Sequence, residues 1–180
     1  MEALGISSAS VVGVSQGGMI AQHLALEYPE RVEKLVLAVT LSRPNPTMQD
    51  TLHAWITMAE CGDYKRLIVD TAEKSYSDAY LRLRRPLLPL LMLCGKPKEV
   101  SRFLIEAASC LSHNTYDRLP AIQCPTLVLG GSADRIVGAQ ASREIAGQIH
   151  GSELYLYDGL GHAAYEEAKD FPMRVLRFLQ

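Results

Sequence analysis

Strong charge of one sign is missing from this sequence, whose 180 residues carry a formal net charge of −2. Lysine and arginine form no run, and their tightest cluster is Arg82, Arg84 and Arg85. Three charges in one stretch are typical of a solvated helix face, whereas nucleic-acid binding needs a concentrated positive patch. The sequence therefore predicts no nucleic-acid partner.

Cysteine is scarce, and long hydrophobic runs are absent. The chain has four scattered cysteines without a C-x-x-C pair: Cys61, Cys94, Cys110 and Cys124. Disulfide frameworks and zinc sites use closely patterned cysteines and histidines. The most apolar stretch, residues 87–94, is far shorter than the ~20 residues that cross a bilayer, and no signal peptide is visible. We expect a cytoplasmic protein with reduced thiols, no membrane association, no metal and no cofactor.

What the sequence does contain is a glycine-rich turn near its start. Residues 8–14 include the β-branched pair Val11-Val12, which is typical of a buried strand. Residues 16–28 place three apolar side chains at helical spacing: Ile20, Leu24 and Tyr28. The sequence therefore predicts a strand, a tight turn and a helix beginning at residue 16.

The turn has the G-x-S-x-G pattern of a nucleophile elbow, with Ser15 at its centre. Such a turn strains the serine backbone and is tolerated only if the side chains two residues to either side are tiny, so Gly13 and Gly17 are expected to provide that space. The helix that follows points free N–H groups at any oxyanion formed there. The alternative interpretation is an ordinary glycine-rich turn with a chance serine.

Three further apolar segments complete an expected parallel sheet of about four strands: 35–41, 124–130 and 153–157. Residues 42–118 instead show helical patterns after Pro44 and Pro46. The fold class is therefore α/β, with a core formed by residues 1–41 and 119–180 and a helical cap formed by residues 42–118. The alternative is a helical subdomain that packs away from the sheet ends.

A serine needs a base to accept its proton and a carboxylate to orient that base. Ser15, Asp134 and His162 each follow an expected strand, and the carboxyl ends of parallel strands meet at one edge of a sheet. Asp158 is the rival carboxylate, although it suits a loop turn better. The other histidines are expected to be surface or core residues: His23, His53, His113 and His150.

The sequence resembles the α/β-hydrolase superfamily in three stretches: residues 13–18, residues 125–134 and Gly161-His162. Within this superfamily, its motifs are similar to those of the small esterases, enol-lactonases and cofactor-free haloperoxidases. The resemblance implies Ser15 as nucleophile, His162 as general base and then acid, Asp134 as its orienting carboxylate, and the Gln16 backbone N–H as one oxyanion donor.

The resemblance departs from the family at the start of the chain. Only 14 residues precede Ser15, where relatives place several strands and the loop with the second oxyanion donor. We therefore expect the carboxyl-terminal two-thirds of a hydrolase, with an unpaired apolar edge on its first strand. That edge would pair with another chain or form a homo-oligomer.

Two functions follow from these residues. The first is a serine hydrolase that cleaves a small, largely apolar ester, lactone or thioester through an acyl-enzyme on Ser15; the apolar residues 87–92 of the cap suggest an apolar substrate group. The alternative is a catalytically impaired fragment or scaffold that binds a ligand or another chain. Esterases, lactonases, acyltransferases and carbon–carbon bond hydrolases all use this fold with a serine, an aspartate and a histidine, so the sequence does not distinguish among these reactions.

Overall fold

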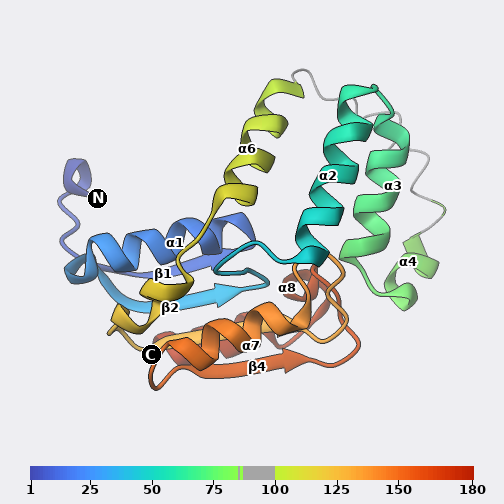
Figure 1. The fold of residues 1–180 in the computed structure, drawn as a ribbon. Coiled ribbons are helices and arrows are strands. Elements are labelled where there is room, and N and C mark those ends of the chain that lie inside the picture. The colour runs from blue at the N-terminus through green and yellow to red at the C-terminus, as the bar shows by residue number, and fades with distance from the viewer. Residues whose placement is uncertain (85, 87–99) are drawn as a thin grey trace.

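Four parallel strands form the centre of the protein, as seen in a computed structural model that describes residues 1–84, 86 and 100–180 (Figure 1). The strands lie in the order β1-β2-β3-β4. Their bounds are β1 Ala9–Val14, β2 Val32–Ala38, β3 Thr126–Gly131 and β4 Glu153–Tyr157. Each pair is parallel, so all four carboxyl ends open at the same edge of the sheet. The predicted α/β fold class is confirmed.

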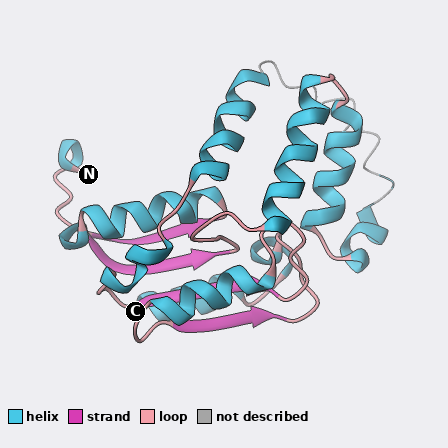
Figure 2. Ribbon diagram, in the orientation of Figure 1, coloured by secondary structure: helices cyan, strands magenta, loops and turns pink. Residues whose placement is uncertain are grey.

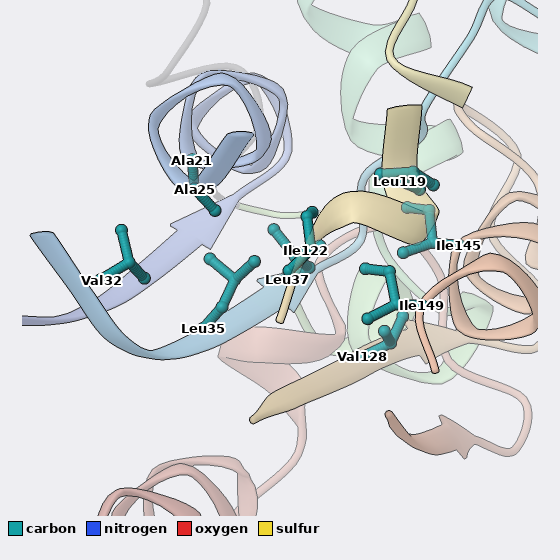
Figure 3. Close-up of a cluster of buried hydrophobic side chains, with 10 residues drawn as sticks. All are labelled: Ala21, Ala25, Val32, Leu35, Leu37, Leu119, Ile122, Val128, Ile145 and Ile149. Carbon is teal, nitrogen blue, oxygen red and sulfur yellow. The ribbon is translucent and has the colours of Figure 1, made fainter. Parts of the chain in front are cut away.

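Helices cover both faces of this sheet (Figure 2). On one face, α1 (Gln16–Glu27) and α7 (Ala139–Gln148) pack over alternate strand residues such as Leu35 and Leu37 (Figure 3). On the other face, α8 (Ala164–Glu167) and α9 (Phe171–Leu179) pack over Val36 and its neighbours. Apolar burial on both faces explains the nearly unbroken hydrophobic run of β2. Short 3-10 turns connect or precede these elements: Glu2–Leu4, Pro29–Arg31 and Tyr116–Ala121. Of these, the last adds a buried side chain, Leu119, to the core.

Among the described residues, four further α-helices lie between β2 and β3 in the sequence, above the carboxyl ends of the strands (Figure 1). They are α2 (Pro46–Glu60), α3 (Tyr64–Ser75), α4 (Asp78–Arg84) and α6 (Val100–Ser112). Asn45 and Asp63 start α2 and α3 by accepting hydrogen bonds from backbone N–H groups three residues on. The apolar residues 87–92 of the expected cap lie outside the described residues.

Helix α1 exposes two of the three apolar residues whose spacing predicts it. Ile20 is 65% exposed and Tyr28 is 53% exposed. The helix buries Ala21 and Ala25 against the sheet, and it buries Met19 among side chains of α2. The reason is the close approach of α1 to the end of β2, which only small side chains permit. Helical spacing alone does not reveal this constraint.

Strand β1 lies at an edge of the described sheet and pairs only with β2. Within this strand, Val12 exposes its apolar side chain and Val11 is partly exposed. The expected apolar edge is therefore present in the described part of the chain. Among the described residues, no helix is both long and apolar enough to span a membrane.

Candidate active site

Ser15 occupies the sharp turn between β1 and α1. Its backbone has φ 52° and ψ −121°, a left-handed conformation that is strained for any residue with a side chain. The Ser15 N–H donates to the Ala38 carbonyl at 2.9 Å, and the Ser15 carbonyl accepts from the Gly18 N–H at 2.9 Å. These bonds fix the strained turn at the carboxyl end of the sheet.

Gly13 and Gly18 provide the space that this turn needs. A Cβ on Gly13 would lie 2.6 Å from the Gly17 carbonyl oxygen and 2.8 Å from the Ala21 Cβ, and one on Gly18 would lie 2.6 Å from the Thr40 Cβ. A Cβ on Gly17 would meet no atom within 4 Å. The prediction that Gly17 must be tiny is therefore wrong, because a side chain at position 17 would enter open space, and Gly18 has this role instead.

We expect Gly13→Ala to lower the free energy of unfolding by about 1–3 kcal/mol, because the added methyl group meets backbone that must shift. Gly17→Ala is the matched control and should leave stability unchanged or slightly raised, since alanine favours helix. Urea denaturation of the two variants measures the difference. Equal stabilities would contradict the tight packing of the elbow.

The structure brings Ser15, His162 and Asp134 into one hydrogen-bonded relay. His162 Nε2 lies 2.8 Å from Ser15 Oγ, and His162 Nδ1 lies 2.9 Å from Asp134 Oδ2. His162 and Asp134 are both buried. With the aspartate ionised, Nδ1 carries the proton and donates to it, so Nε2 is free to accept the Ser15 proton.

The Asp134 carboxylate is also fixed by hydrogen bonds from the backbone. Its Oδ1 accepts hydrogen bonds from the backbone N–H groups of Ile136 at 2.8 Å and Val137 at 3.0 Å. Both donors stabilise the ionised carboxylate and leave Oδ2 for the imidazole. The rival Asp158 instead accepts from the Ser132 hydroxyl at 3.1 Å, as a loop-turn residue would.

The remaining histidines lie away from this relay. His53 and His150 are exposed, and His23 pairs with Glu27 on the surface of α1 at 3.3 Å. His113 is buried and contacts the His23 ring edge-on at a centroid distance of 5.3 Å. Burial, together with the His23 charge, lowers the pKa of His113 from 6.5 to about 4.

This lowered pKa predicts a loss of stability in acid. Because His113 is more basic in the unfolded chain, its contribution is fully present above pH 6.5 and is lost as the pH falls toward about 4. The loss should be roughly 3 kcal/mol at most, at about 1.4 kcal/mol per pKa unit. Urea midpoints at pH 7 and pH 4.5 should differ less in His113→Asn than in the parent chain. An equal pH dependence would contradict this assignment.

A pocket of about 270 Å³ opens beside Ser15 and His162. Its apolar lining comes from α1, α2, α6 and the loop after β3: Met19, Met48, Leu52, Trp55, Phe103, Ala107, Ile136 and Val137. Four polar residues also line it: Gln16, Thr71, Ser75 and Glu106. Sequence reasoning missed Trp55 and Phe103, because helical spacing marks an apolar face without showing which neighbour it meets.

Among the described residues, no group of three His, Cys, Asp or Glu side chains lies together so that it could hold a metal ion. Of the cysteines, Cys61 is exposed, while Cys110 and Cys124 are half-buried free thiols whose pKa values burial raises. Cys94 lies outside the described residues.

The chain has clear relatives. Residues 1–169 match the family model described as "alpha/beta hydrolase fold". The chain is 29% identical over 189 residues to a 2-hydroxymuconate semialdehyde hydrolase of Pseudomonas putida, an alignment covering 99% of this chain and 65% of the relative. The chain therefore spans about 65% of the length of such curated relatives.

Solved structures share its fold. An alpha/beta hydrolase enzyme from a Medee basin deep-sea metagenome library superposes with a TM-score of 0.91 at 27% identity, over 98% of this chain and 66% of that one. The enol-lactonase of Burkholderia xenovorans superposes with a TM-score of 0.87 at 21% identity, over 99% of this chain and 68% of that one. The second likeness concerns the fold alone.

Proposed function

The chain belongs to the α/β hydrolase fold family, and we propose that it is a serine hydrolase acting through an acyl-enzyme on Ser15. The observation that carries this proposal is the relay from Ser15 Oγ through His162 to Asp134, with distances of 2.8 and 2.9 Å. These distances are within the reach that general-base activation of a nucleophile requires.

In the first proposed step, Ser15 Oγ bonds to the substrate carbonyl carbon as its proton passes to His162 Nε2. The carbonyl π electrons move to oxygen, and the Gln16 backbone N–H at the start of α1 donates to that oxyanion. Asp134 stabilises the imidazolium without taking its proton. Collapse of the intermediate breaks the bond to the leaving oxygen or sulfur, which takes the proton from His162.

Water completes the proposed cycle. His162 Nε2 accepts a proton from the water as its oxygen attacks the acyl carbon. The second tetrahedral intermediate then releases the carboxylic acid, and Ser15 Oγ regains its proton from His162. Ser15 and His162 thus act in both halves of the reaction, which involves no oxidation or reduction.

The pocket supports a compact, largely apolar acyl or alcohol group. Its volume of about 270 Å³ is near the lower end of ligand pockets, which run from about 300 to 1,000 Å³. Among p-nitrophenyl esters, acetate to butyrate should therefore be hydrolysed with kcat/KM values on the order of 10-fold above those of decanoate.

Phe103→Ala tests which side chain limits this pocket. The variant should shift the preference toward longer acyl chains, because Phe103 lines the pocket. Ile105→Ala, on the same helix but 70% exposed, is the control and should leave the chain-length profile unchanged. A flat profile in the parent chain, or the same profile in both variants, would contradict the assigned pocket.

A further inference from the structure

The corner between α3 and α4 contacts the segment that carries His162. The described residues of this corner are Ser75, Tyr76 and Ser77, and we call it the α3–α4 corner. The Ser75 carbonyl accepts from the Ala163 N–H at 2.8 Å, one residue beyond the histidine. A Cβ on Gly161, one residue before it, would lie 2.6 Å from the same carbonyl oxygen.

Two carboxylates of α8 complete this contact. Ser77 donates twice to Glu167, with its backbone N–H reaching Oε1 at 2.9 Å and its hydroxyl reaching Oε2. Tyr76 donates its hydroxyl to Glu166 Oε2 at 2.7 Å. Burial, together with this carboxylate, raises the pKa of Tyr76, so the hydroxyl keeps its proton and remains a donor.

From these contacts we propose that the α3–α4 corner positions His162, with Glu167 as the main positioning residue. Glu167 does not touch the relay. It holds α8 against the corner, so that the backbone on both sides of His162 meets Ser75. This inference rests on the proposed function, because positioning affects catalysis only if His162 is the base.

The geometry explains why the effect should fall on turnover. Ser75 and Thr71 line the pocket, yet Glu167 does not, so loosening the corner leaves most substrate contacts in place. The separation of 2.8 Å between His162 Nε2 and Ser15 Oγ would lengthen. Misplacing a reacting group by about 1 Å can cost on the order of 100-fold in rate.

Glu167→Ala should therefore lower kcat for p-nitrophenyl butyrate by about 10- to 100-fold and change KM by less than about threefold. Glu167→Gln should recover most of this loss, since its amide oxygen can accept from the Ser77 N–H while its NH₂ donates to the Ser77 hydroxyl. Glu60→Ala, an exposed glutamate at the end of α2, is the control and should match the parent chain.

Ser77→Ala gives a milder variant in case Glu167→Ala does not fold. The double variant Ser77→Ala/Glu167→Ala should lose no more kcat than Glu167→Ala, because both residues act through one contact. Additive losses, or an unchanged kcat in every folded variant, would overturn the positioning role.

Hydrogen exchange separates this inference from the proposed function. In Glu167→Ala, amides of the peptide spanning residues 160–167 should exchange at least about 10-fold faster than in the parent chain, and in Glu167→Gln they should not. If Glu167→Ala left the exchange rates unchanged, the positioning role of the α3–α4 corner would be overturned even in an active enzyme. If Glu167→Ala exchanged faster but the parent chain hydrolysed no ester, the proposed function would be contradicted instead.

Discussion

Ser15→Ala should reduce ester turnover by about 10⁴-fold or more while leaving the fold intact. The substitution removes the only protein atom that forms a bond to substrate in the proposed reaction. The backbone bonds of residue 15 to Ala38 and Gly18 remain, and alanine bears the left-handed φ of 52° at a cost similar to that for serine. Initial rates with p-nitrophenyl butyrate, together with circular dichroism, measure both effects.

The control for this variant is Ser101→Ala, an exposed serine on α6 outside the pocket lining. It should hydrolyse the ester at the parental rate. If Ser15→Ala kept more than about a tenth of the parental kcat while folded, the acyl-enzyme mechanism would be wrong.

Asp134→Asn should lower kcat by about 10⁴-fold, because the substitution changes which nitrogen of His162 carries the proton. The backbone N–H groups of Ile136 and Val137 both donate to Oδ1, so they select the amide oxygen at that position. The amide NH₂ then faces His162 Nδ1, which must become an acceptor. Nε2 consequently carries the proton and cannot take the one on Ser15.

Asp158→Asn provides a matched control for this prediction. Its carboxylate follows β4 and accepts from Ser132 rather than from His162. Turnover should stay within about threefold of the parent chain, as is usual for a surface substitution. A large loss in Asp158→Asn with a small loss in Asp134→Asn would reverse the assignment of the acid.

The order of elements and the relay could be predicted from the sequence because both follow from short-range patterns. Apolar runs predict strands β1 to β3, and alternating apolar residues predict β4, which has the predicted bounds of Glu153–Tyr157. Residues that follow parallel strands meet at one edge of the sheet, so the serine, aspartate and histidine could be placed together from sequence positions alone.

Other features depend on contacts between distant segments, which a single sequence does not reveal. The small face of α1 is buried because Gly18 meets Thr40, and this also explains why the steric role assigned to Gly17 was wrong. The burial of His113 depends on its packing near α1, and the contact of the α3–α4 corner with Glu167 joins residues 90 positions apart. Such pairings follow from tertiary packing, which overrides local periodicity.

The most direct test of the proposed chemistry is intact-mass analysis after exposure to a fluorophosphonate, which reacts with activated serines. We expect a single adduct on the 180-residue chain, no adduct on Ser15→Ala, and strongly slowed labelling of Asp134→Asn. Circular dichroism should show that all three proteins are folded. A folded parent chain that takes no adduct, or a Ser15→Ala chain that still takes one, would contradict the assignment of Ser15 as an activated nucleophile.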